Sequence, residues 1–270
     1  MSDASAAASP LPIRAMGFAF DHEIPLLWNP SIPELAAAAN SISLLMPYVE
    51  PSIARSVRAA APELDDLLRA RTEAFARQEL GHHAQHRRFN DVLAAQCPSL
   101  RRFERWVARA YGWVERRGLP FRLAFAAGSE TIAFGIARWV ERHLPTIFGP
   151  VEPETTRLFV WHLAEEVEHK TAAFDVFEAT GGSRLRYTVA TALSLLLLIV
   201  FTISGSLLML RSQRRLRLPV TWFRLARWSL SLAFSLLPVL AVSCLPGHHP
   251  RDLVDPAYLT QWLRGAEPPK

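Results

Sequence analysis

Apolar positions along this chain recur with the 3.6-residue period of an α-helix, and no segment alternates apolar and polar residues as a half-buried strand would. The pattern predicts helices over about 33–46, 62–95, 98–118, 120–143 and 152–179, with a short helical stretch after Pro51. Most boundaries carry Pro or Gly, which begin and end helices. We therefore expect an all-α fold.

Polar residues occupy the apolar rows of three of these helices. The rows run through Leu68, Thr72, Phe75, Glu79, His82, His86, Phe89 and Leu93; through Leu123, Ala127, Glu130, Phe134 and Ala137; and through Phe159, His162, Glu166, His169, Ala173 and Val176. Rows with this spacing face the interior of a helical bundle. A cation must accompany the carboxylates on them, because buried carboxylates without a partner are strongly destabilising.

The last third of the chain has a different pattern. Residues 188–210 and 228–247 carry no charged residue, and arginines flank and connect the two runs. The first run is long enough to cross a bilayer. Residues 1–187 hold 21 Lys and Arg against 22 Asp and Glu, whereas 188–270 hold 9 against 3. Because this basic excess brackets apolar segments, it indicates a membrane rather than a nucleic acid as partner.

We therefore divide the chain into four parts. Residues 1–30 are expected to be a flexible segment, 31–187 a metal-binding helical bundle, 188–247 a membrane-associated apolar helical hairpin, and 248–270 a tail. The alternative for the hairpin is a pair of buried helices on the bundle. No cleavable signal is evident, so we expect the bundle in the cytoplasm. Two cysteines, Cys97 and Cys244, allow neither a disulfide framework nor a thiolate metal site.

Two E-x-x-H units, Glu79 to His82 and Glu166 to His169, lie 87 residues apart. Residues three apart share a helix face, so each unit directs a carboxylate and an imidazole to one point. A dinuclear bundle site needs two such units and one Glu from each of two further helices, for which Glu50 and Glu130 are the candidates.

In this site Glu79 and Glu166 bridge two ions, Glu50 and Glu130 are outer carboxylates, and His82 and His169 each cap one ion. The set suits iron, with manganese and zinc as alternatives. His86 and His162 lie on the same rows as second-layer donors, further ligands or proton carriers, or as core histidines. The alternative for the whole cluster is a buried network with arginine or lysine.

Two longer signatures surround these units. They read Arg77-Gln78-Glu79 with His82 and His86-Arg87-Arg88-Phe89-Asn90, and Trp161-His162 with Ala164-Glu165-Glu166, Glu168-His169-Lys170 and Ala173-Phe174-Asp175-Val176. With Ser129-Glu130 and Met46-Pro47 before Glu50, they resemble the bacterial "predicted metal-dependent hydrolase" family over about residues 40–265. The resemblance implies a ferritin-like four-helix bundle with a dinuclear metal centre. Pro51 departs from the smooth helix expected after Glu50 and predicts a kink or a helix end.

Three functions follow from this set of residues. The first is activation of dioxygen by two irons against an apolar or lipid-like substrate. The second is hydrolysis by a metal-bound water. The third is storage or sensing of metal or oxygen at a membrane without turnover. The sequence leaves the substrate and a homo-oligomeric state open.

Overall fold

The structure, a computed structural model, describes residues 11–20, 24–149, 151 and 153–265, and these ranges contain helices and no strand. The all-α prediction is confirmed. The longer elements are α2 (Pro33–Ser43), α3 (Met46–Ala60), α4 (Asp66–Gln96), α5 (Ser99–Glu115), α6 (Leu119–Glu141), α8 (Pro153–Glu168), α9 (Ala172–Ala179), α10 (Arg184–Ser212) and α11 (Pro219–Ser243). Shorter ones are η1 (Ala61–Glu63), α7 (Leu144–Phe148), η2 (Arg215–Arg217), η3 (Pro250–Asp252) and α12 (Ala257–Leu263).

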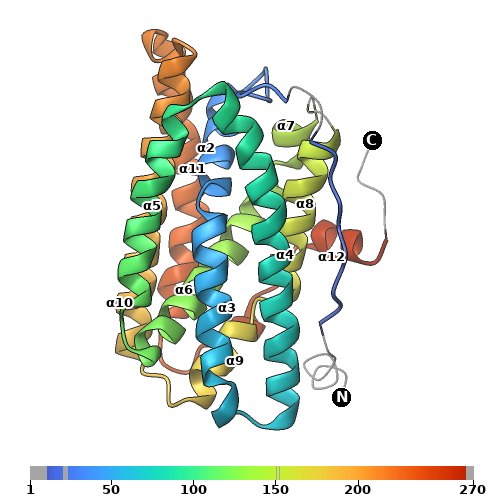
Figure 1. The fold of residues 1–270 in the computed structure, drawn as a ribbon, viewed down its shortest axis with the longest axis vertical. Coiled ribbons are helices and arrows are strands. Elements are labelled where there is room, and N and C mark those ends of the chain that lie inside the picture. The colour runs from blue at the N-terminus through green and yellow to red at the C-terminus, as the bar shows by residue number, and fades with distance from the viewer. Residues whose placement is uncertain (1–10, 21–23, 150, 152, 266–270) are drawn as a thin grey trace.

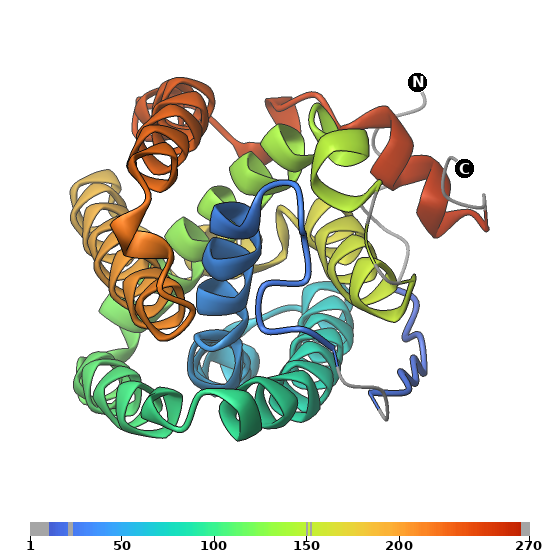
Figure 2. The same cartoon turned by 90° about the horizontal axis from the view of Figure 1, so that it is seen from above.

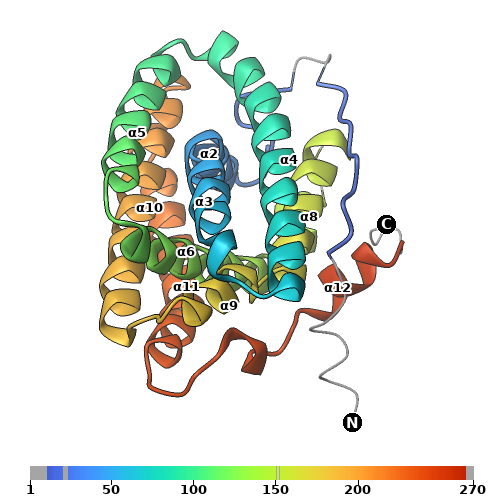
Figure 3. The ribbon, with the colours of Figure 1, turned by 60° about the horizontal axis from the view of Figure 1, so that its bottom comes forward.

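Helices α2 and α3 lie near the centre of the molecule (Figures 1 and 2). Helix α3 packs along α4 and α6, and α6 also packs against α8 and α9. Figure 3 shows α3 between α4 and α6, with α8 beyond α4. The four helices α3, α4, α6 and α8 carry the expected ligands. The ferritin-like description of this bundle stays a prediction.

The predicted inward rows are buried. Every row residue on α6 is buried, and so is every row residue on α4 except Leu68, which is half-buried. The row through α8 and α9 is also buried throughout. The 3.6-residue period therefore places the carboxylates and imidazoles correctly in the core.

Three local predictions need correction. Helix α4 begins at Asp66 rather than near Pro62, because the Asp65 side chain accepts a hydrogen bond from the Leu68 N–H and caps the helix there. The helix predicted over 152–179 is interrupted at residues 169–171. Pro51 lies inside α3 rather than at its end, so Glu50 is one turn into a continuous helix.

The side chains at the interruption bond to other elements. Lys170 donates to the Leu253 carbonyl at 2.6 Å, and the Thr171 hydroxyl donates to Asp175 at 2.8 Å. Arg71 of α4 in turn donates to the Thr171 hydroxyl. These bonds hold the interruption against α4 and the segment after η3, and they link residues that helical periodicity does not connect.

The apolar hairpin packs on the bundle along one side. Helix α10 contacts α6 and α2, and α11 contacts α6. Small residues permit this close approach: a Cβ on Gly128 would lie 2.9 Å from the Thr191 Cα, and one on Gly205 would lie 2.7 Å from the Ser41 Oγ. The other side of the hairpin exposes large apolar side chains, among them Leu185, Val189, Leu196, Ile199, Ile203, Phe223, Leu230, Phe234 and Leu237.

By length and composition alone, α10 and α11 could each cross a membrane. Since one side of the hairpin packs on the bundle and the other exposes apolar side chains, α10 and α11 are neither buried core helices nor free of the bundle.

The described part of the N-terminal segment, 11–20 and 24–30, lies against α4 and α8. Phe18, Ile24 and Trp28 are buried in the same core as the bundle. Gln78 of α4 donates to the Pro12 carbonyl at 3.0 Å. Residues 1–10 of the expected flexible segment and 266–270 of the expected tail lie outside the described residues.

Candidate metal centre

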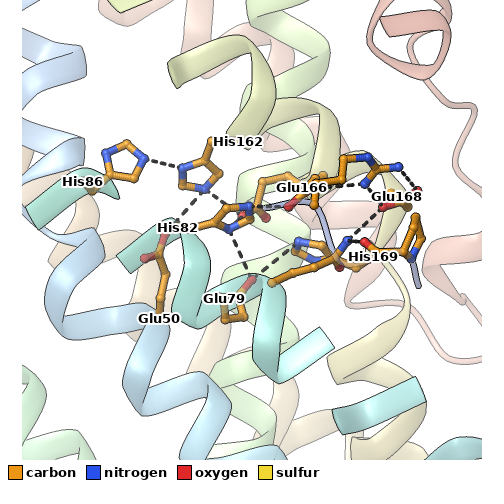
Figure 4. Close-up of polar contacts among 12 residues, drawn as sticks. Glu50, Glu79, His82, His86, His162, Glu166, Glu168 and His169 are labelled. Atoms are coloured by element: carbon orange, nitrogen blue, oxygen red, sulfur yellow. Dashed lines mark hydrogen bonds and ion pairs between the residues drawn. The ribbon is translucent and has the colours of Figure 1, made fainter. Parts of the chain in front are cut away.

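Four helices bring the expected ligands together in the core (Figure 4). Glu50 comes from α3, Glu79 and His82 from α4, Glu130 from α6 and Glu166 from α8, and His169 follows the end of α8. All six side chains are at most 3% exposed. In the described chain, the ion-pair partners of the four carboxylates are histidines rather than lysine or arginine. The alternative of a buried arginine or lysine network therefore receives no support.

The ligand-type atoms form two adjacent groups. Glu79, His82, Glu166 and His169 each offer one atom within 4.8 Å of the others, and Glu50, His86 and His162 form a second group by the same measure. Glu166 belongs to the first group and also approaches His162 of the second (Figure 4). Its Oε1 lies 3.9 Å from Nδ1 of His82 and 2.8 Å from Nε2 of His162. Two ion positions that share Glu166 would match this arrangement.

Several buried atoms at this point have no hydrogen-bond partner in the described structure. They are both carboxylate oxygens of Glu50, Oε1 of Glu79, Nδ1 of His82, Oε2 of Glu166 and Nε2 of His169. Buried polar atoms are almost always paired, because an unpaired one is destabilising by about 1–3 kcal/mol. Their gathering at one place is the observation that the residues fit a metal centre.

A carboxylate lies behind each E-x-x-H histidine. Oε2 of Glu165 is 3.0 Å from Nε2 of His82, and Oε2 of Glu130 is 2.9 Å from Nδ1 of His169. When each remote nitrogen donates its proton to that carboxylate, the unpaired nitrogen keeps its lone pair for an ion. Arg14 donates to Oε1 of Glu165 at 3.0 Å and so fixes the first of these carboxylates.

Hydrogen bonds also determine the tautomer of His162. The amide of Asn90 donates to the Ser43 carbonyl, so its oxygen accepts the Ser43 hydroxyl proton at 2.7 Å. The Ser43 oxygen, 2.8 Å from Nδ1 of His86, must then accept from that ring. Nε2 of neutral His86 accepts in turn from Nδ1 of His162 at 2.6 Å.

Nε2 of His162 is thereby left facing Glu166 at 2.8 Å and Glu50 at 3.6 Å. Unless it carries a second proton, this nitrogen presents a lone pair to two carboxylates, and a cation among them would satisfy all three groups. His162 is thus better placed as a direct ligand than as a second-layer donor, and His86 is the residue that orients it.

Burial and mutual repulsion raise the carboxyl pKa values. Burial, followed by the charges of Glu166 and Glu130, raises the pKa of Glu50 well above its usual range. Burial and the same two neighbours do the same for Glu79. Burial also raises the pKa of Glu130 to about 7. Without a cation, these groups therefore retain protons that metal binding must displace.

Burial raises the pKa of Glu166, but the nearby histidines His169, His162 and His82 together outweigh it and hold this pKa at about 2. Burial lowers the pKa of His169, but the carboxylates of Glu166, Glu130 and Glu165 together outweigh it and raise this pKa to about 9. Burial lowers the pKa values of His82 and His86 well below the usual range, so both rings are neutral above pH 7.

The directions of these pKa shifts determine whether the stability of the metal-free protein rises or falls with pH. Between pH 7 and 9, the metal-free folded chain holds a proton on His169 that the unfolded chain releases, since the ordinary His pKa is near 6.5. Stability rises with pH only where the unfolded state binds more protons. The stability of the metal-free protein must therefore fall as pH rises through this window.

The structure brings together every residue predicted for the site. Glu130 lies behind His169, so its role as an outer ligand stays a prediction. Two participants were not predicted: Arg14, in the segment expected to be flexible, and Glu165, which occurs only within the second signature. The bond between them joins residues 151 positions apart in sequence, and no local pattern reveals it. His249, in the expected tail, is buried and bonded to Asp175 at 3.0 Å.

Four helices that enclose a cluster of carboxylates and imidazoles, with ligand atoms unpaired, define a helical protein built around a metal-binding core. A comparison with protein families agrees: the family described as "predicted metal-dependent hydrolase" matches residues 12–253, and the chain belongs to this family. The resemblance seen in the sequence is thus confirmed. Neither a curated protein nor a solved structure matches the chain.

Proposed function

We propose that this protein is a metal-dependent hydrolase with two divalent ions in its helical core. Glu79, His82 and His169 would hold one ion, and Glu50 and His162 the other, with Glu166 shared between them. The convergence of unpaired buried ligand atoms supports this proposal. Two divalent ions would also neutralise the four buried carboxylates, which no arginine or lysine of the described chain does.

Bound ions would polarise a substrate carbonyl and lower the pKa of a water molecule toward neutrality. The chain's own residues prepare the site. Glu165 and Glu130 orient the imidazoles of His82 and His169, and His86 keeps the proton of His162 on Nδ1. Apolar side chains line the open side of the cluster and exclude bulk water, which strengthens electrostatic interactions there.

The family description favours hydrolysis over the oxidation with dioxygen that the sequence also suggested, and that oxidation receives no support. Carboxylate and imidazole donors accommodate iron, manganese or zinc, so the donor set leaves the metal open.

We also propose that the hairpin lies on a membrane surface rather than crossing it. Helix α10 packs lengthwise on the bundle and also contacts α5, whose four arginines are exposed. A crossing hairpin would draw these charges into hydrocarbon, which is strongly unfavourable. A helical face that exposes apolar residues on one side and adjoins an arginine-rich connection is typical of interfacial binding.

Sedimentation with vesicles of phosphatidylglycerol and phosphatidylcholine tests the membrane proposal. The protein should sediment with the vesicles, and Phe234→Asp should release a large fraction of it. Leu67→Asp is the matched control, because Leu67 is an exposed apolar residue on α4. Full retention of the protein in the supernatant at low salt would reject the proposal.

Hydrolysis of p-nitrophenyl butyrate tests the reaction. Metal-loaded protein should release nitrophenol, and chelator treatment or Glu79→Gln should abolish the release. Glu73→Gln is the control, since Glu73 lies on the same helix but pairs with Arg58 at the surface. Equal rates with and without metal would refute metal-dependent hydrolysis. Oxygen consumption by the ferrous form with dodecanoate present would favour oxidation instead.

A further inference from the structure

An apolar cavity adjoins the candidate metal centre. Its volume is about 110 Å³, and Glu50, Glu79, Glu130 and Glu166 line one part of it. The remaining walls are mostly apolar, with contributions from α2, α3, α6, α8 and α10. The chemical groups of the cluster therefore face a space that favours hydrocarbon over water.

A second apolar cavity of about 170 Å³ lies next to the first. The two share four lining residues, Ile42, Ile136, Phe159 and Leu163. Each volume is comparable to an engineered cavity of about 150 Å³ that binds benzene. The shared residues are uncharged, so a route between the two cavities would be apolar.

The second cavity ends between the two hairpin helices. Thr202 of α10 and Leu225, Ser229 and Leu232 of α11 line it. Helices α10 and α11 pack mainly on α2 and α6 and little on each other, so no tight helix contact closes this end. Ser229 is exposed, and its neighbour Leu230 belongs to the exposed apolar face of the hairpin.

A single carboxylate lies at this far end. Glu34 accepts a hydrogen bond from the Thr221 hydroxyl at 2.8 Å and lies 3.7 Å from Arg224. These contacts join the start of α11 to α2. The residues that the two cavities share carry no charge.

We propose that the two cavities form a passage for one hydrocarbon chain. The carbonyl end of a long-chain acyl compound lies at the metal cluster, and its tail extends between α10 and α11 toward the apolar face of the hairpin. The reaction at the carbonyl end rests on the proposed function, whereas binding of the tail does not.

Binding of saturated fatty acids from butyrate to dodecanoate, measured by equilibrium dialysis with metal-loaded protein, tests the passage. Each added methylene should tighten binding about fourfold until the passage is filled. Ile136→Trp, at the junction, should stop this gain at a shorter chain than in the wild type. Leu232→Trp should stop it at a longer one. Leu230→Trp, an exposed neighbour on α11, is the matched control and should follow the wild type.

The same series with Glu79→Gln separates the passage from the reaction. If the ions hold the carboxylate end, Glu79→Gln should weaken binding of every acid by the same factor, and if the metal proposal fails, the affinities should not change. In both cases the increase with chain length remains. An affinity that does not change with chain length in the wild type would overturn the passage. The passage would also be overturned if Ile136→Trp and Leu232→Trp, both folded, bound fatty acids up to the same chain length as the wild type.

The chain could come from solution or from a bilayer. Faster uptake of dodecanoate from phosphatidylcholine vesicles than from buffer would support delivery from a membrane through the hairpin. Equal or slower uptake would support a passage that takes free acids from solution.

Discussion

Replacing Glu50 by leucine should stabilise the metal-free protein and reduce the further stabilisation that metal ions give. Both carboxyl oxygens of Glu50 are buried without a partner in the described structure, and burial raises its pKa well above the usual range. A buried polar group without a hydrogen bond is destabilising by about 1–3 kcal/mol. Leucine removes this term and suits the apolar wall formed by Leu45, Val49 and Ile53.

We therefore expect Glu50→Leu to raise the free energy of unfolding of chelator-treated protein by about 1–3 kcal/mol. With metal at a hundredfold excess over its dissociation constant, the wild type gains about 2.7 kcal/mol for each ion bound. Glu50→Leu should lose the stabilisation that one of the two ions gives. The assay is urea unfolding at pH 7.5, with and without metal.

Glu104→Leu is the matched control. Glu104 is as buried as Glu50, but it pairs with Arg87 at 2.6 Å and with Arg101 at 3.3 Å. Loss of these charged hydrogen bonds should destabilise the protein by about 1–2 kcal/mol, with or without metal. If Glu50→Leu destabilises the metal-free protein as Glu104→Leu does, the reasoning about the unpaired carboxyl is wrong.

Three further predictions concern packing, pH and orientation of the ligands. Gly128→Ala should lower the free energy of unfolding by about 1–3 kcal/mol, because the added Cβ would meet Thr191. Gly81→Ala, with open space around it, should raise the free energy of unfolding by up to about 1 kcal/mol. The free energy of unfolding of metal-free protein should fall between pH 7 and 9, by up to about 1.4 kcal/mol per pH unit, because His169 stays protonated there only in the folded state, and an increase would contradict its raised pKa. Arg14→Ala should weaken metal binding about 10- to 100-fold in a chelator competition, because Glu165 loses its fixed position behind His82, and unchanged affinity would remove Arg14 from the site.

Helical periodicity suffices to place the ligands but not to assign their roles. Glu79, His82, Glu166 and His169 fall on inward rows because residues three and four apart share a face. His86 and His162 fall on the same rows, yet their roles depend on Ser43 and its bonds across helices. Such bonds link residues far apart in sequence, and no local pattern encodes them.

The remaining differences have local physical causes. Pro51 lacks an N–H and was expected to disturb α3, but the helix continues because burial against α4 and α6 stabilises it. At the break after α8, Lys170 and Thr171 bond to partners in other elements, which no local pattern reveals. The hairpin packs on the bundle on one side only: small residues bring that side close to the bundle, and large exposed apolar residues occupy the other.

The number of metal ions per chain tests the central claim most directly. Protein reconstituted with ferrous, manganous or zinc ions and freed of excess should contain two ions per chain by elemental analysis. His162→Ala should reduce this number to one, and the double variant Glu79→Ala with Glu166→Ala should reduce it to zero. Full retention of metal in the double variant, or no bound metal in the wild type, would contradict a dinuclear centre at these residues.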